Sequence, residues 1–352
     1  MTPLRIGMIA PITHAVPPDG YGPWEQVVFD LVEALVALGH DVTLYAVAGS
    51  RTSARLVTSP AEPIEHSSDD RWFDPGPDPR VLEQVHIASA VEAAAAEGLD
   101  VLHSHLHVHA LVFSRLAPCP MITTLHGSAW NRAHHPALRA YREQAFVSIS
   151  DAERGYLPEL HYVATVHNGI ATDDFPLGGG GDHLLFAGRL APEKAPDLAV
   201  AVARQSGRTL VIAGMVEDRH RDFFDARVRP ALADGDIDYV GDLSRGEMAE
   251  AYGRAAATLV PLRWDEPFGL VSVESMAAGT PVIAWRRGAL PEIVETGVTG
   301  FVVAGTAEAA AAVAMIADID RSACRVAVER RFSREVMARG YVAAYEAVLG
   351  GR

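Results

Sequence analysis

Two acidic residues, Glu266 and Glu274, are the clearest candidates for chemistry in this sequence. They lie eight residues apart, and if the second falls about one turn inside a helix, the two carboxylates are separated along its axis by roughly 6 Å or more. Two carboxylates so placed can bind opposite ends of one elongated ligand. Glu274 stands among apolar residues such as Val273 and Met276, where an acid without a partner is costly. We therefore interpret it as a functional acid rather than a solvated surface residue.

The residues around these acids predict a loop, a helix and a strand. The helix is expected over Leu270 to Ala278, because Gly279 can adopt the left-handed conformation that ends a helix and Pro281 cannot continue it. A short buried strand is expected over Val282 to Trp285. Asp265 and Glu266 lie before this helix, in a loop that contains Pro and Gly.

The start of the predicted helix is suited to an anion. The N–H groups of Phe268, Gly269 and Leu270 lie where a helix has unpaired donors and a positive dipole end, which favours a phosphate. Gly269 would also let the anion approach the backbone closely. We predict a phosphate-bearing ligand between the two glutamates.

Composition limits the class of protein. At 352 residues with 49% apolar content, the chain has material for two domains of ordinary size. A net charge of −15 argues against nucleic acid as a main partner. Cys119 and Cys324 form no metal or disulfide pattern. No signal peptide or membrane span is evident, so we expect a cytoplasmic protein.

The first half begins with a strand, a helix and a strand, predicted over Leu4 to Ala10, Pro23 to Leu38 and Val42 to Ala48. Such a unit has parallel strands and a right-handed crossover. Its connecting loop places Gly20 and Gly22 at the carboxyl end of the first strand, where open α/β sheets bind ligands. We therefore expect this glycine loop to belong to a ligand site.

Glu25 and Pro23, which follow these glycines, limit the kind of ligand site that the loop can form. A dinucleotide-binding motif would need a third glycine where Glu25 stands, so we do not expect a dehydrogenase. Pro23 supplies no N–H, so it either removes one backbone contact to a ligand or serves as the first residue of the helix. The sequence leaves both interpretations of Pro23 open.

Arg51 to Arg80 is rich in Pro, Ser, Asp and Glu without periodicity, which predicts a long surface loop. Its acids balance its arginines, which argues against strong membrane association. A helix is expected over Val81 to Gly98.

Histidines occupy alternate positions in the stretch Val101 to Ala110. If the stretch stays extended, His103, His105, His107 and His109 share one face. A zinc site would need an accompanying Cys or acid, and none completes it. We favour a strand end that lines a cleft between the domains.

Strands expected over Met121 to Leu125, Ala145 to Ser150 and Tyr162 to Val166 complete a parallel sheet of about six strands. The four glycines Gly178 to Gly181 follow, and such a run does not hold a fixed conformation easily, so we predict the hinge between the domains there.

A second series of strands begins at His183 to Gly188, followed by Arg189 and Lys194 ahead of a helix. An Arg and a Lys in a strand-to-helix turn can neutralise the charge that grows on a departing diphosphate. The Arg/Lys pair alone is weak evidence, because many loops carry such residues.

Three further strands are expected over Thr209 to Gly214, Asp238 to Gly241 and Ala257 to Pro261. In a parallel sheet their carboxyl ends lie at one edge, which brings Gly214, Val240 and Gly241 to the edge that bears Arg189 and Glu266. We expect a nucleobase there, held largely by backbone groups. A last amphipathic helix is expected over Ser333 to Leu349.

These motifs together resemble a known family. EPFGLVSVE is similar to the E-x7-E signature of retaining, nucleotide-sugar-dependent glycosyltransferases of family 4, and GTPVIAWRRGALPEIVETGVTGFVV resembles the stretch that follows it. Arg189, Leu190 and Lys194 match the R-L-x-x-x-K pattern of that family. The resemblance covers essentially the whole chain.

The resemblance implies the α/β fold called GT-B, in which two Rossmann-like domains face each other across a cleft. The expected domains are residues 1–168, completed by a C-terminal helix at 334–352, and residues 169–333. The first domain would face the acceptor, and the second would bind the nucleotide sugar.

The resemblance also implies roles. Glu274 would bind the ribose, Glu266 the sugar, Arg189 and Lys194 the diphosphate, and His126 the sugar from the first domain. A nucleoside diphosphate sugar would be the donor. Apart from the resemblance, Trp24, the non-basic region 51–80 and the Ala/Arg-rich composition suggest a soluble small-molecule or oligosaccharide acceptor, as in antibiotic biosynthesis. No metal or other cofactor is expected. A GT-B sugar-nucleotide epimerase and a non-catalytic sugar-nucleotide-binding protein remain as alternatives.

Overall fold

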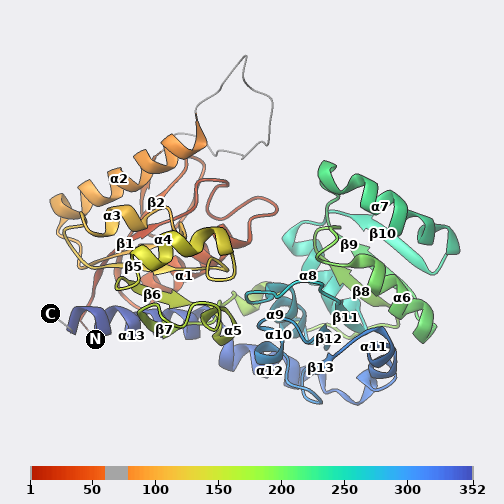
Figure 1. Cartoon of the computed structure of the whole chain (residues 1–352). Helices are drawn as coiled ribbons and strands as arrows, with labels where there is room; N and C mark the ends of the chain where they lie inside the picture. Colours follow the sequence, from red (N-terminus) through yellow and green to blue (C-terminus); the bar gives the residue numbers. More distant parts are fainter. Residues whose placement is uncertain (1, 60–77, 351–352) are drawn as a thin grey trace. The chain divides into compact units, whose positions relative to one another are not determined.

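The computed structural model describes residues 2–59 and 78–350, and the chain folds into two compact units (Figure 1). Unit 1 comprises Met1–Gly169 together with Arg334–Arg352, and unit 2 comprises Ile170–Ser333. Each unit is a parallel sheet with helices, which confirms the predicted α/β class with two Rossmann-like domains. The chain thus leaves unit 1 once and returns to it for its last helix.

Unit 1 contains a seven-stranded sheet, and every neighbouring pair of strands is parallel. Five of its seven strands are buried at every residue or at all but one, because helices cover both faces of a parallel sheet. In sheet order the strands are β3 (Arg55–Thr58), β2 (Asp41–Ala46), β1 (Arg5–Ile9), β4 (Val101–Ser104), β5 (Met121–Thr124), β6 (Ala145–Ser148) and β7 (Tyr162–Thr165).

The helices of unit 1 include the C-terminal helix, drawn in blue beside the red and yellow elements (Figure 1). This helix packs against α1 and β7. Its buried Tyr345 hydroxyl lies 2.8 Å from Nδ1 of His103, so side chains as well as packing attach it to the sheet. The helices are α1 (Pro23–Ala37), α2 (Pro79–Glu97), α3 (Leu111–Ser114), α4 (His135–Ala140), α5 (Asp151–Arg154) and α13 (Arg334–Gly350).

Pro23 is the first residue of α1, with Gly22 as the N-cap. The structure therefore supports the interpretation of Pro23 as a helix-starting residue, where its missing N–H is not needed. Part of the stretch predicted as an irregular loop forms β3, which pairs with β2 and corrects that prediction. Residues 60–77 of the same stretch lie outside the described residues.

Val101 to Ala110 does not stay extended, so the condition for a shared histidine face is not met. β4 ends at Ser104, opposite the last residue of β1, and the chain then turns. His107 has a left-handed backbone with φ of 52°, which no strand residue adopts. The four histidines therefore do not share one strand face.

Unit 2 contains a six-stranded sheet that is also parallel throughout. In sheet order the strands are β10 (Ile237–Gly241), β9 (Leu210–Ala213), β8 (Leu184–Ala187), β11 (Ala257–Val260), β12 (Val282–Trp285) and β13 (Gly300–Val303). The helices are α6 (Pro196–Ser206), α7 (Arg221–Arg227), α8 (Arg245–Arg254), α9 (Leu270–Ala277), α10 (Leu290–Ile293), α11 (Thr306–Val313) and α12 (Arg321–Arg331). Apolar side chains from these strands and helices form one core, which includes Phe186, Ile212 and Ile283.

The prediction of a hinge at Gly178 to Gly181 is wrong, because this run lies inside unit 2 and is held by hydrogen bonds. Gly178 N–H donates to Ala278 O at 3.0 Å, and Gly180 N–H donates to Gly253 O at 3.0 Å. A Cβ atom on Gly178 would lie 2.1 Å from the same Gly253 oxygen. Gly178 is therefore glycine because two backbone segments touch there, not because the chain must bend.

Candidate functional site

The loop that carries Glu266 enters α9 through a glycine. Gly269 is the N-cap of α9 with φ of 100°, a conformation that side chains disfavour. The helix and the strand after it lie within one residue of their predicted ends, and Gly279 has the expected positive φ of 79°. The first N–H groups of a helix have no acceptor within the helix, so the start of α9 can bind an anion. The Phe268 ring is buried against Phe332, which leaves only its backbone for such a role.

A second backbone segment fixes the position of Glu266. Ala289 N–H donates to Glu266 O at 2.8 Å. Gly288 has φ of 53°, and a Cβ atom on it would lie 2.2 Å from the same Glu266 oxygen. The loop that bears the acid is thus clamped by the turn after β12, which explains the glycine in the RRGAL stretch.

Lys194 and Glu266 form an ion pair, with 2.7 Å between Nζ and Oε2. Their side chains are 22% and 15% exposed, so the pair is partly shielded from water. Nζ also lies 4.9 Å from the centre of the Trp264 ring, a cation–π distance. Ala195, which follows Lys194, has φ of 57° at the start of α6. The structure therefore brings one predicted cation and one predicted acid together.

Arg189, which follows β8, is paired with two acids. Its guanidinium lies 2.9 Å from Glu217 Oε2 and 3.3 Å from Glu193 Oε1. Burial opposes ionisation of Glu217, but Arg219 and Arg189 outweigh it and lower its pKa. Both predicted cations of the donor site are thus neutralised by carboxylates, and an incoming diphosphate would compete with these acids.

Glu274 lies inside α9, and α8 supplies its partners. The hydroxyl of Tyr252, a fully buried residue, donates to Glu274 Oε2 at 3.0 Å. Arg245 lies 4.0 Å from Oε1 and pairs with Asp174 at 3.1 Å. Burial raises the pKa of Glu274, while Arg245 and Tyr252 act in the opposite direction. The carboxyl group of Glu274 is therefore held in place by Tyr252 and Arg245 and is not simply solvated at the surface.

The loops after β9 and β10 lie at the same edge as Arg189 and Glu266, because all these strands are parallel. Gly214 N–H donates to Gly241 O at 2.7 Å. Val240 is 40% exposed beside them, on the edge strand. The predicted grouping of Gly214, Val240 and Gly241 along this edge is present.

His126 follows β5 in unit 1 and is buried, with φ of 44°. Its Nε2 lies 2.7 Å from Nδ1 of His105. Burial, together with neighbouring histidines, holds its pKa well below the usual value, so the ring is neutral at pH 7. Gly20 and Gly22 lie in the loop after β1, as predicted. The backbone of Gly20 shows no feature that requires glycine.

Sequence reasoning missed the partners of the acids. Tyr252 and Arg245 lie more than twenty residues before Glu274, and nothing in their local sequence marks them. Trp264 and Gly288 lie beside Glu266 in the fold and were also missed, although a Trp next to two acids in a loop was a usable signal. Among the described residues, no group of three or more His, Cys, Asp or Glu is arranged to hold a metal ion.

Comparisons with known proteins agree with this geometry. A family model described as Glycosyltransferase Family 4 matches residues 24–174, and one described as Glycosyl transferases group 1 matches residues 173–327. The D-inositol 3-phosphate glycosyltransferase of Frankia alni is 30% identical over 342 residues, which cover 79% of this chain and 81% of the relative. The chain belongs to glycosyltransferase family 4.

Solved structures support the GT-B fold of this glycosyltransferase. AviGT4, a glycosyltransferase involved in avilamycin A biosynthesis, is 23% identical with a TM-score of 0.75, and the match covers 99% of each chain. The Anabaena protein HepE, solved with UDP and glucose, is 16% identical with a TM-score of 0.69 over 96% of this chain and 98% of that one. The epimerase and binding-protein alternatives are not favoured, because the relatives are named glycosyltransferases. None of the helices in the described part of the chain has the length and apolar content needed to cross a bilayer.

Proposed function

We propose that this glycosyltransferase transfers a sugar from a nucleoside diphosphate sugar to a hydroxyl group with retention of anomeric configuration. The observation that carries the proposal is the Lys194–Glu266 ion pair at the start of α9, with the held carboxylate of Glu274 farther along the same helix. A cation and helix N–H groups suit a diphosphate, and two separated carboxylates suit hydroxyl groups on both sides of it.

Each candidate site residue has a proposed role. Glu274 accepts hydrogen bonds from the ribose hydroxyls, and Glu266 binds hydroxyls of the transferred sugar. Arg189, Lys194 and the N–H groups of Gly269 and Leu270 bind the diphosphate and stabilise the charge that develops as it leaves. The backbone of Gly214 and Gly241 would bind the base. His126 of unit 1 is proposed to contact the sugar.

The ion pair between Lys194 and Glu266 has a consequence for the order of events. Lys194 cannot give its full charge to both Glu266 and a diphosphate, so donor binding would draw Nζ away from the acid. Glu266 would then be released to bind the sugar hydroxyls. Diphosphate recognition and sugar recognition would thus be linked through one ion pair.

Retention is proposed to occur by front-face substitution, in which the acceptor oxygen attacks on the side from which the diphosphate leaves. The C–O bond to the leaving phosphate breaks as the bond to the acceptor forms, and the departing phosphate takes the hydroxyl proton. Arg189 and Lys194 supply positive charge at the leaving group, so we propose a metal-independent reaction. Transfer that persists in excess EDTA would support this proposal.

The acceptor is proposed to be a small molecule or an oligosaccharide rather than a membrane lipid. Named relatives point to different acceptors, since one is a D-inositol 3-phosphate glycosyltransferase and another takes part in avilamycin A biosynthesis. A role in antibiotic biosynthesis is therefore a proposal that rests on the second likeness, and a cytoplasmic location is proposed with it.

Nucleotide binding tests the proposed donor site. UDP, GDP, ADP and dTDP would be titrated into the full chain by calorimetry, and at least one is expected to bind. Glu274→Ala should weaken the best binder at least about tenfold, because a carboxylate loses hydrogen bonds to hydroxyl groups. Glu250→Ala, which removes an exposed acid paired with Arg254 on α8, is the matched control and should leave binding unchanged. Failure of all four nucleotides to bind would overturn the proposal. The nucleotide that binds identifies the nucleotide sugar to use as donor. In the glycoside that this donor forms with an acceptor, NMR should show the same anomeric configuration as in the donor.

A further inference from the structure

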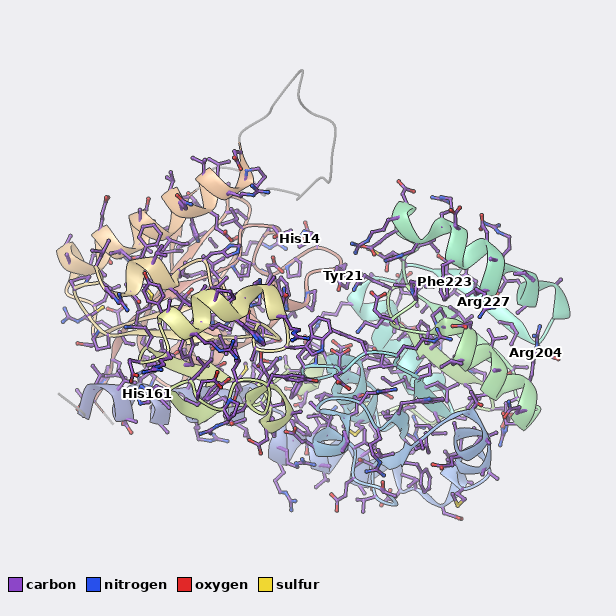
Figure 2. All side chains as sticks on the ribbon, viewed as in Figure 1. His14, Tyr21, His161, Arg204, Phe223 and Arg227 are labelled. Carbon is purple, nitrogen blue, oxygen red and sulfur yellow. The ribbon has the colours of Figure 1, made fainter. Side chains whose placement is uncertain are left out.

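Trp24 is an exposed aromatic side chain in the first turn of α1. It is 43% exposed, and its ring meets His107 edge to face, with 4.7 Å between ring centres and 74° between planes. Tyr21, in the loop before α1, is 48% exposed and is labelled in Figure 2. Farther along α1, Val28 and Leu31 are buried in the core, whereas Trp24 in the first turn stays partly exposed. The two exposed rings therefore contribute little to folding, and large exposed rings often mark binding surfaces.

His107 presents an unused hydrogen-bond acceptor beside this ring. Its Nδ1 lies 2.6 Å from Leu125 O, and because a carbonyl oxygen can only accept, Nδ1 carries the proton. Burial is the main cause that lowers the pKa of His107 to about 4, so the ring is neutral at pH 7. Nε2 then carries a lone pair, and no described atom donates to it. A buried acceptor without a donor costs free energy, so a ligand hydroxyl that donates a hydrogen bond to Nε2 would bind favourably.

The backbone at His107 is also unusual. Among the described residues other than glycine, positive φ occurs at His107, His126 and Ala195. Ala195 follows Lys194, and His126 is the proposed sugar contact, so two of the three lie beside proposed donor-site residues. Side-chain-bearing residues adopt this conformation only when the surrounding structure requires it, and such residues concentrate at functional sites. His107 is the one that the proposed function has not yet used.

The titratable groups near these rings are neutral, acidic or already paired. Burial lowers the pKa of His105 and His134 and raises the pKa of Glu25 to about 7. Glu83 raises the pKa of His109, but the two side chains form an ion pair with each other. In the part of the chain that the structure describes, no Lys or Arg forms an ion pair or cation–π contact with Trp24 or His107. Tight phosphate binding needs cationic side chains or several N–H donors. The surface therefore suits a ligand without phosphate.

We propose that Trp24 and His107 form an acceptor subsite for a neutral, polyhydroxylated ring such as a pyranoside. The C–H face of the ring lies against the exposed indole, and one hydroxyl donates to Nε2 of His107. Nε2 is buried, so the hydroxyl can reach it only if a neighbouring side chain moves, and the proposal assigns this movement to Trp24, the partly exposed ring that meets His107. This inference rests on the proposed transferase function and adds the chemical class of the acceptor.

Two substitutions separate the stacking surface from the hydrogen-bond acceptor. Trp24→Ala removes an exposed ring. In His107→Asn the side-chain amide can still donate to Leu125 O, and Asn tolerates positive φ, but the Nε2 acceptor is lost. His161→Asn is the matched control, because His161 is exposed on unit 1 and its Nδ1 faces the Glu143 carbonyl at 3.4 Å. Thermal unfolding would verify that all three variants fold.

Saturation-transfer difference NMR on the full chain would detect weak binding of named probes. The probes are methyl glucoside, methyl galactoside and methyl mannoside, with glucose 6-phosphate and mannose 6-phosphate for comparison. At least one neutral glycoside should bind, with the strongest transfer to the protons on one ring face. Its dissociation constant should rise about fivefold in His107→Asn and at least about fivefold in Trp24→Ala. It should not change in His161→Asn, and the phosphorylated sugars should bind no more tightly than the neutral ones.

The inference is overturned if no neutral glycoside binds, if a phosphorylated sugar binds more tightly than the neutral ones, or if Trp24→Ala or His107→Asn leaves binding unchanged. Nucleotide titration of the same samples separates this failure from failure of the proposed function. If nucleotides still bind and any of these results is found, only the proposed acceptor subsite is ruled out. Absence of nucleotide binding would instead remove the donor site.

Discussion

Tyr252→Phe tests whether Glu274 is held in place for ligand binding. The substitution keeps the ring and its contact with Phe175, whose ring centre lies 6.3 Å away, and removes only the hydroxyl that donates to Glu274 Oε2. A hydrogen bond to a charged group contributes about 1.5–3 kcal/mol. The Glu274 side chain is 20% exposed, so water can partly replace the lost donor and the lower end of this range applies. About 1.5 kcal/mol corresponds to roughly a tenfold rise in the dissociation constant of the nucleotide.

The pH dependence gives a second measurement of the same bond. The Tyr252 hydroxyl helps to lower the pKa of Glu274, although burial raises it overall. Loss of the hydroxyl should raise this pKa further, so more of the carboxyl is protonated in mildly acidic solution. The loss of nucleotide affinity should therefore be larger at pH 6 than at pH 8, as measured by calorimetry at both values.

A double-mutant cycle decides whether Tyr252 acts through Glu274. In a Glu274→Ala background, Tyr252→Phe should cause no further loss of affinity. Tyr45→Phe is the control, because Tyr45 is buried and its hydroxyl has no hydrogen-bond partner among the described residues. Equal losses in the presence and absence of Glu274, or an unchanged dissociation constant in the single variant, would refute the reasoning.

Three further predictions concern packing, charge and pH. Gly178→Ala should lower the free energy of unfolding by about 2 kcal/mol or more, because its Cβ would lie 2.1 Å from a backbone oxygen. Gly179→Ala should leave the free energy of unfolding unchanged, because no atom lies within 4 Å of its Cβ. Equal effects of the two substitutions in urea unfolding would contradict the packing argument. Lys194→Ala should slow sugar transfer about 100-fold while changing nucleotide affinity less, and an unchanged kcat would remove Lys194 from the site. Burial raises the pKa of Glu153 from 4.5 to about 7, so the folded state holds a proton that the unfolded state loses, and stability falls by up to about 3 kcal/mol as pH rises through this window. Glu153→Gln should reduce that fall between pH 5 and pH 8, and an identical pH dependence in urea unfolding would show that burial does not shift this carboxyl.

Local patterns in the sequence were enough to predict the elements that carry the proposed donor site. Gly279 and Pro281 end α9 where expected, and β12 spans the predicted Val282–Trp285. Parallel strands place their carboxyl ends at one edge, so Arg189 and Glu266 could be assigned to the same edge from the order of elements alone. These inferences succeeded because capping, turns and buried strands depend on neighbouring residues.

The errors came from features that depend on distant parts of the chain. Alternation at His103 to His109 would give a shared face only in an extended segment, but the strand ends where its neighbour β1 ends. Four consecutive glycines predicted flexibility, but Gly178 packs against Gly253, which is far away in the sequence. A sequence pattern records which conformations are easy, and it does not record which other backbone will lie against a residue.

The sequence by itself determined the family of this glycosyltransferase, its two α/β units and the carboxylates and cations proposed for a donor site, because these follow from residue types and their spacing within short segments. Only the tertiary structure decided what each of those groups contacts. It paired Lys194 with Glu266 and Tyr252 with Glu274, and it put Trp24 against His107. The physical reason is that a charge, a pKa or an unpaired lone pair is set by atoms within a few ångströms, and folding draws those atoms from separate helices and strands.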